Sequence, residues 1–171
     1  MSRKIIRSVS LLALAALSVP LLSGASRPAG DLSLIYGIYD LQEWHTEGGV
    51  LKPPQIYGHF VVRNGTITTV LHNGVDPGYT TIAGIGHYTL QNGKFAYQYD
   101  HSETFSKKGG TITVDGDLPW KGLKVFDVIE QTPTSLKIRT ADGDTEFDFT
   151  PTSFAAFDHG KPLRSYKRLA K

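Results

Sequence analysis

The chain has 171 residues, with 18 lysine and arginine side chains, 16 aspartate and glutamate side chains and no cysteine. This length suits one domain, and the lack of cysteine excludes disulfides and zinc sites built on thiolates. Residues 26–160 carry 10 basic and 16 acidic side chains, a net charge of −6, which argues against nucleic acid as a partner because such binding needs a basic surface.

The first stretch, "MSRKIIRSVSLLALAALSVPLLSGAS", has the pattern of a secretory signal peptide: a positive start, an apolar run and then small residues. We predict that residues 1–25 are removed by cleavage after Ala25 and that a domain over 30–171 is secreted or periplasmic. The apolar run of roughly 14 residues is short for the ~20 that span a bilayer. No stable membrane insertion is therefore expected after cleavage; an uncleaved anchor is the alternative.

Asn-Gly or Asp-Gly dipeptides at positions 64, 73, 92, 115 and 142 mark tight turns in the remaining chain. Type I′ turns need positive φ at both central residues, which Asn or Asp followed by Gly tolerates best. Runs rich in Tyr, Phe, Val, Ile and Thr predict strands over 33–45, 56–63, 66–72, 82–90, 94–105, 122–130, 134–140, 144–150 and 162–169. The best candidate for a single helical turn is "TSFAAFD" at 152–158.

Consecutive strands joined by short turns form an antiparallel meander. Closing the meander into a barrel removes both sheet edges, whereas a sandwich only shortens them. We therefore predict an all-β, antiparallel up-and-down barrel of eight to nine strands, with a sandwich as the alternative. An eight-stranded barrel has room for about one small ligand.

The strand 94–105 contains the main candidate site. The odd positions of this strand share one face and carry Phe95, Tyr97, Tyr99, His101 and Glu103. We predict that this face points inward, because the side chains at the even positions are small and mostly polar. A polar group buried without a hydrogen-bond partner costs roughly 1–3 kcal/mol. A small, largely apolar ligand that supplies such a partner would be oriented by these groups. The alternative is that the tyrosines are core residues, with the imidazole and the carboxylate at the solvated rim.

The two-residue turn at 92–93 sets the register between this strand and the one before it. On that register Gly86 lies opposite Tyr99 and Gly84 opposite His101. Glycine leaves empty volume where a side chain would be, so this pairing indicates a cavity; the alternative is that the glycines relieve barrel curvature. The predicted ligand-binding residues are Tyr97, Tyr99, His101, Gly84, Gly86 and Tyr88.

Several segments resemble the lipocalin-like domains of the calycin superfamily. The segment "YGIYDLQEWH" at 36–45 resembles their opening strand, "GIGHYTLQNGKFAYQYDHSE" at 84–103 their central hairpin, and "RSYKRL" at 164–169 their closing strand. Tyr39 stands where the family has a tryptophan, as in an outlying branch. The resemblance implies a ligand-holding barrel in which Arg168 packs across the Tyr39 ring and closes one end.

Two functions fit a cavity of this kind. The first is a carrier that binds a small, largely apolar or aromatic organic molecule without any cofactor. The second is a cofactor-free isomerase, cyclase or lyase, in which His101 or Glu103 acts as the base while Tyr99 and Tyr97 donate hydrogen bonds to developing negative charge.

A third possibility is an exported module that acts through its surface, with aromatic side chains such as Tyr79 and Trp120 clustered on one patch. No phosphate-binding loop, zinc-protease motif or nucleophile elbow occurs in the sequence. His45 and His59 could lie near one another, but two histidines without a third ligand do not predict a metal site.

Overall fold

Twelve strands and one 3-10 helix make up the part of the chain that the computed structural model describes, residues 32–116 and 122–171. The elements in chain order are η1 (Leu32–Leu34), β1 (Gly37–Thr46), β2 (Gly49–Leu51), β3 (Ile56–Arg63), β4 (Thr66–Asn73), β5 (Thr80–Gln91), β6 (Lys94–Lys108), β7 (Thr111–Gly116), β8 (Lys124–Thr132), β9 (Ser135–Thr140), β10 (Thr145–Phe149), β11 (Ser153–Asp158) and β12 (Lys161–Ala170). The predicted signal peptide and Trp120 lie outside the described residues. Within those residues, no helical segment has the length and hydropathy needed to cross a bilayer.

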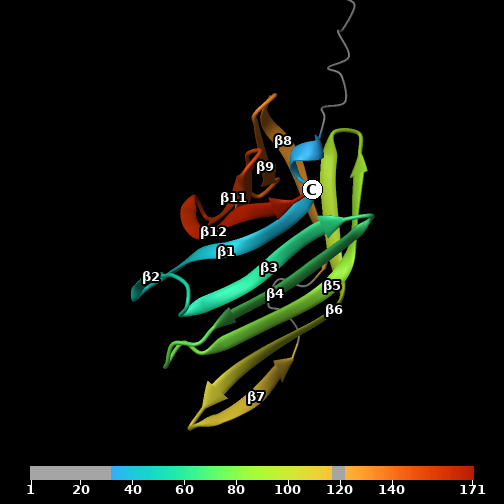
Figure 1. Cartoon of the computed structure of the whole chain (residues 1–171). Coiled ribbons are helices and arrows are strands. Elements are labelled where there is room, and N and C mark those ends of the chain that lie inside the picture. Colours follow the sequence, from blue (N-terminus) through green and yellow to red (C-terminus); the bar gives the residue numbers. More distant parts are fainter. Residues whose placement is uncertain (1–31, 117–121) are drawn as a thin grey trace, which may run out of the picture.

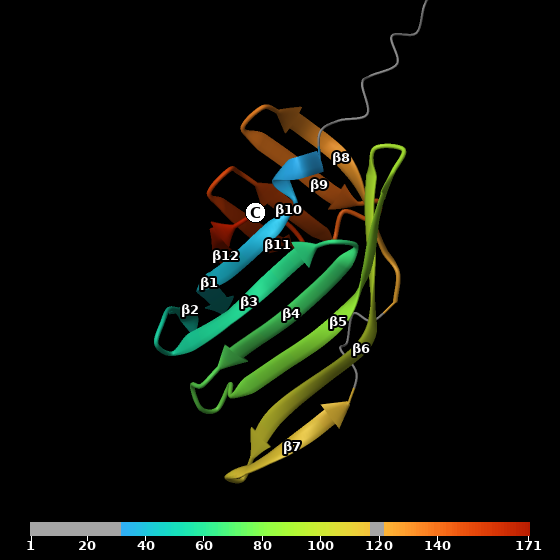
Figure 2. The same ribbon diagram turned by 45° about the vertical axis from the view of Figure 1, so that its right-hand side comes forward.

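The sheet closes on itself because β1 pairs with β12 on one side and with β3 on the other. The barrel wall runs β1, β3, β4, β5, β6, β8, β9, β10, β11, β12, and all these pairs are antiparallel (Figures 1 and 2). The short β2 pairs with β1, and β7 pairs with β6 outside the wall. The predicted all-β antiparallel barrel is confirmed, with ten wall strands in place of the eight to nine expected.

The additional wall strand is β11, which occupies the segment expected to form a helical turn. It enters β12 through a two-residue turn at His159-Gly160, whose φ values of 49° and 74° match those of Asn92-Gly93 at 54° and 72°. Both turns have the paired positive φ of a type I′ turn. The dipeptide pattern missed the second of them because histidine stands where Asn or Asp was sought.

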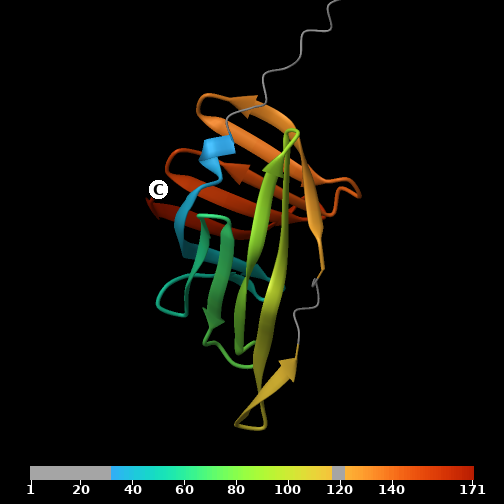
Figure 3. The ribbon, with the colours of Figure 1, turned by 90° about the vertical axis from the view of Figure 1, so that its right-hand side faces the viewer.

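One end of the barrel is closed by η1 and the residues that follow it, beside the turn of the β5–β6 hairpin (Figures 2 and 3). The Tyr39 ring is fully buried there, and its hydroxyl donates to the backbone carbonyls of Leu34 at 2.7 Å and Ile35 at 3.1 Å. The Arg168 guanidinium carbon lies 5.0 Å from the ring centroid, and the guanidinium donates to the Tyr39 hydroxyl and to the Leu34 carbonyl. The expected packing of Arg168 over Tyr39 is therefore present.

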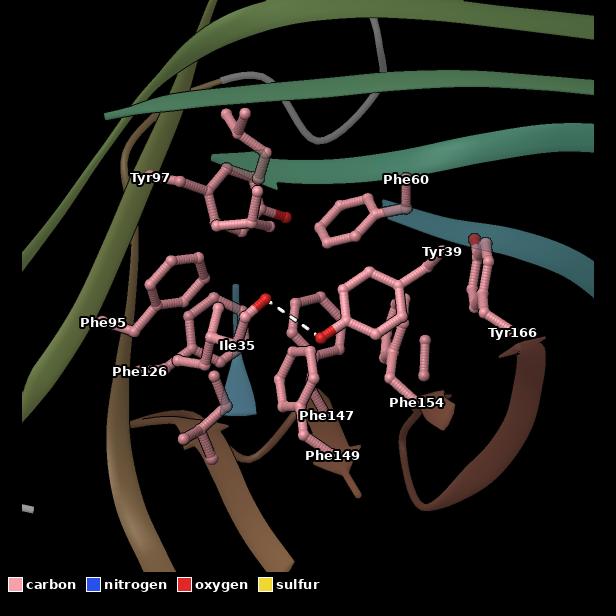
Figure 4. Close-up of a cluster of buried hydrophobic side chains, with 14 of the residues drawn as sticks. Ile35, Tyr39, Phe60, Phe95, Tyr97, Phe126, Phe147, Phe149, Phe154 and Tyr166 are labelled. Atoms are coloured by element: carbon pink, nitrogen blue, oxygen red, sulfur yellow. Dashed lines mark hydrogen bonds between the residues drawn. The ribbon is translucent and has the colours of Figure 1, made fainter. Parts of the chain in front are cut away.

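Aromatic rings from opposite sides of the wall meet inside the barrel next to this closed end (Figure 4). Phe154 and Tyr166 stack almost parallel, with centroids 4.4 Å apart. Phe126 and Phe147 stack at 4.9 Å, and the Tyr39 ring meets Phe154 edge to face at 5.2 Å. Such pairs contribute roughly 0.5–1.5 kcal/mol each beyond the burial of their area, so this half of the barrel is a packed core.

Candidate functional site

A β-bulge in β6 decides which of the candidate residues face the interior. Gly86 pairs with Tyr99, as predicted, but Ile85 pairs with His101, which leaves Asp100 as an extra residue. One extra residue moves every later side chain to the other face, because side chains alternate with a period of two. Tyr97 and Tyr99, which precede the bulge, are buried as expected.

Beyond the bulge, His101 and Glu103 lie on the outer surface of the barrel, where both are exposed. His101 pairs with the exposed Ile85, whereas Thr104 pairs with the buried Ile82 and takes the inward face. The predicted inward orientation of His101 and Glu103 is therefore wrong. The Tyr/His/Glu set that the catalytic hypothesis requires is not assembled inside the barrel.

The two glycines of β5 do not leave empty volume beside β6. Gly84 pairs with Ser102 and not with His101, and a Cβ added at Gly84 would lie 2.9 Å from the ring of Tyr99. A Cβ at Gly86 would lie 1.9 Å from the backbone oxygen of Gln98. The glycines allow the Tyr99 ring and the β6 backbone to approach β5 closely, which corrects the prediction that they open a cavity.

Tyr88 packs at the closed end. Its ring centroid lies 6.0 Å from that of Tyr36 and 5.9 Å from that of Phe95. Tyr88 does not contribute to the lining of the cavity described next. The structure thus brings Tyr97 and Tyr99 together at that cavity and places the other predicted residues in the wall, at the closed end or outside.

A cavity of about 320 Å³ lies in the barrel next to the aromatic core. Aromatic side chains form much of its lining, namely Phe60, Tyr97, Tyr99, Phe147, Phe154, Phe157 and Tyr166. It reaches the surface at Asp158 and His159, which are both exposed. Its volume falls at the lower end of the range of roughly 300–1,000 Å³ that is usual for small-molecule sites.

The polar groups of the lining include three phenols and a guanidinium. The Tyr99 hydroxyl is hydrogen-bonded to that of Thr69, and Arg164 forms a hydrogen bond with Tyr166. Tyr97 is only 6% exposed, and no hydrogen bond joins its hydroxyl to another of the described residues. Figure 4 shows the Tyr97 ring directed from β6 into the interior, toward Phe60.

Burial is the largest influence on the acidity of these phenols. It raises the pKa of Tyr97, of Tyr99 and of Tyr166 above the ordinary value for tyrosine, although the charge of Arg164 lowers each pKa in part. Phenols with raised pKa values remain protonated at neutral pH. They can therefore donate hydrogen bonds to a ligand, and they are poor candidates for a general base.

Arg164 is half-buried and extends from β12 toward β1, where its guanidinium carbon lies 4.3 Å from the centroid of the Trp44 ring. Trp44 faces inward because β1 has a bulge of its own, in which Gln42 is the extra residue between the pairs of Leu41 and Glu43. The bulge reverses the parity that the sequence alone gives to Trp44, and the ring is 9% exposed.

Charged side chains gather at the rim of the cavity. His159 Nε2 lies 3.2 Å from a carboxylate oxygen of Asp144, and its Nδ1 lies 3.1 Å from one of Asp158. Lys124 also contributes to the lining. Among the described residues, no cluster of three or more His, Cys, Asp or Glu side chains is arranged to hold a metal ion.

The aromatic groups considered for a surface-acting module are only partly defined. Tyr79 is half-buried and meets His72 at 5.1 Å, and His72 in turn meets the exposed Tyr57 at 4.4 Å. Trp120 lies outside the described residues, so the patch predicted to contain it is not tested.

Sequence reasoning missed Arg164 and Tyr166, although a signal for them was present. The closing strand carries Arg164, Tyr166 and Arg168 at every second position. Because alternate residues of a strand share a face, the expected inward placement of Arg168 applies to the other two as well.

No protein-family model, curated protein or solved structure matches the chain.

Proposed function

We propose that the protein is an exported, lipocalin-like barrel that binds a small, largely apolar or aromatic organic molecule in its central cavity. The observation that carries this proposal is the cavity of about 320 Å³, walled by aromatic rings and open at a rim of charged residues. Apolar walls with a few convergent polar groups are typical of small-ligand sites. Tyr97 and Tyr99 would contact the ligand, with Gly84 and Gly86 shaping the wall behind them.

Binding is favoured over catalysis by the position of the candidate bases. His101 and Glu103 lie outside the barrel, and burial keeps the three phenols of the cavity protonated. A set of hydrogen-bond donors holds an acceptor in place but does not abstract a proton from carbon. The isomerase, cyclase or lyase alternative therefore loses the residues on which it depended.

Mass spectrometry of the protein purified from its native source tests the proposal. We expect one compound, or a few related ones, to be released unchanged when the protein is denatured. Conversion of an added candidate into a product would favour the enzyme instead. Absence of any bound compound, together with failure to bind a library of small aromatic and aliphatic molecules, would refute the proposed function.

Two neighbouring alanines of β11 provide a matched test of the location. Ala156 lines the cavity and is 6% exposed, whereas Ala155 has the opposite orientation and lines a groove on the barrel surface. We expect Ala156→Phe to fill part of the cavity and weaken ligand binding by roughly ten-fold or more. Ala155→Phe should leave affinity unchanged, and an equal loss in both variants would place the ligand elsewhere.

Export is tested separately. The mass of the protein recovered from the periplasm or the medium should correspond to a chain that begins at residue 26. Recovery of the intact chain from the membrane fraction would instead favour the uncleaved anchor.

A further inference from the structure

The polar groups of the cavity share one chemical property: they can present hydrogens to a ligand. Tyr97 and Tyr99 offer neutral phenols, and Arg164 offers a guanidinium that carries donors only. Tyr97 lines the cavity, and its hydroxyl has no hydrogen-bond partner within the described residues. A donor group left open toward the cavity suits a ligand that presents a hydrogen-bond acceptor.

The position of Arg164 favours a charged acceptor over a neutral one. Tyr97, Tyr99 and Tyr166 line the same cavity as Arg164, and its positive charge lowers the pKa of each of these phenols in part. The Trp44 ring, 4.3 Å from the guanidinium carbon, holds the guanidinium on the β1 side. Charge-assisted hydrogen bonds from arginine to a carboxylate are roughly twice as strong as neutral ones, and low local polarity strengthens them further.

The lining also contains two carboxylates, those of Asp144 and Asp158. Both lie at the rim, where their oxygens are 3.2 Å and 3.1 Å from the two ring nitrogens of His159. Lys124, also in the lining, adds a second positive charge. Three apolar rings, those of Phe60, Phe147 and Phe154, also line the cavity.

From these contacts we infer that the ligand is a small aromatic or aliphatic carboxylic acid. Its carboxylate accepts hydrogen bonds from Arg164 and Tyr97, and its apolar body lies against Phe60, Phe147 and Phe154. The volume of about 320 Å³ lies at the lower end of the usual range for small-molecule sites, which suits a small ligand. This inference rests on the proposed function, because it names the class of molecule that the cavity binds.

A pair of probes with the same shape and different charge tests the inference. The probes are 2-naphthoate, which is ionised at pH 7, and 2-naphthamide, which is neutral. Calorimetric titration of the mature chain should show the acid binding roughly ten-fold more tightly than the amide, because only the acid forms charge-assisted hydrogen bonds.

Variants then assign the preference to Arg164. Arg164→Gln should abolish the preference for the acid while leaving the amide affinity within about three-fold, and Arg164→Lys should retain part of the preference because the charge remains. Tyr97→Phe should weaken both probes, since acid and amide each carry an acceptor oxygen. Arg139→Gln is the matched control: this arginine is exposed on β9, paired with Glu146 at 2.8 Å, and lies outside the cavity lining.

The failure of the inference differs from the failure of the proposed function. Equal affinity of the wild-type chain for acid and amide would overturn the inference and leave the binding function in place, and so would an acid preference that persists in Arg164→Gln. Failure of the wild-type chain to bind either probe would also overturn the inference, whereas the proposed function falls only if no compound is found bound and the library of small molecules fails to bind as well. The wild-type comparison requires no variant to fold, so it decides the question even if Arg164→Gln is unstable.

Discussion

Two arginines of β12 each pack on an aromatic ring of β1, and the contrast between them distinguishes the two ends of the barrel. Arg168 pairs with Tyr39 at the closed end, and Arg164 pairs with Trp44 beside the cavity. The Arg168 guanidinium donates to the Leu34 carbonyl, which the turn after η1 places over it. The guanidinium of Arg164 lies at the cavity with three phenols. An arginine packed on an aromatic ring thus closes the barrel at one end and forms part of a candidate ligand site at the other.

The largest expected effect is on stability and comes from removing the arginine of the closed end. Arg168→Ala loses a cation–π contact and two hydrogen bonds and leaves the Leu34 carbonyl without one of its donors, so the free energy of unfolding should fall by about 3 kcal/mol. Arg164→Ala should lower the free energy of unfolding by about 1 kcal/mol. Urea unfolding of both variants measures the two losses. Similar losses in the two variants would mean that the two pairs have the same structural role.

The next largest effect on the free energy of unfolding comes from removing one tyrosine hydroxyl, either at the closed end or at the cavity. Tyr39→Phe loses donation to two backbone carbonyls and acceptance from Arg168, so it should lower the free energy of unfolding by about 2 kcal/mol. Tyr97→Phe removes a hydroxyl without a partner among the described residues and should change stability by less than about 0.5 kcal/mol in either direction. A large loss in Tyr97→Phe would indicate that its hydroxyl has a structural role.

Alkaline pH should destabilise the protein through buried phenols at both ends. Burial raises the pKa of Tyr39, Tyr97, Tyr99 and Tyr166 in the folded state, so these groups hold their protons where the unfolded chain has released them. Their contribution to stability is complete below the unfolded pKa of about 10 and is lost as pH rises toward the folded values, by about 1.4 kcal/mol per pH unit for each tyrosine.

Unfolding measured between pH 9 and pH 11 checks this dependence. The free energy of unfolding should fall less steeply with pH in Tyr39→Phe and in Tyr97→Phe than in the wild-type chain, because each variant has one buried tyrosine fewer. A slope that is unchanged in both would show that these phenols titrate alike in the folded and unfolded chains.

The smallest expected effect lies at the rim. His159 is exposed and its two carboxylate partners are half-buried or exposed, so the ion pairs it forms are screened by water. His159→Ala should change the free energy of unfolding by less than about 0.5 kcal/mol. The type I′ turn at this position adds a comparison: His159→Asn keeps a residue suited to positive φ and should be neutral or slightly stabilising.

The sequence by itself determined the local features of the fold. Runs rich in Tyr, Phe, Val, Ile and Thr between turn dipeptides predicted nine of the strands, and the turn at Asn92-Gly93 set the register that places Tyr88 opposite Tyr97. The expectation that Arg168 packs over Tyr39 came from resemblance, and the structure contains that contact. The strands and the turn register depend on neighbouring residues or on one turn, which is why a sequence can specify them directly. The Arg168–Tyr39 contact joins residues far apart in the chain, and only the resemblance gave it.

Only the tertiary structure decided which side chains reach the cavity. The bulge at Asp100 sends His101 and Glu103 to the surface, and the bulge at Gln42 brings Trp44 inside. A bulge forms where a strand must match the curvature and twist of its neighbours around a closed wall, so its position depends on residues far away in the sequence. Because a single extra residue reverses every later side chain, the face of a strand beyond a bulge cannot be read from its own alternation.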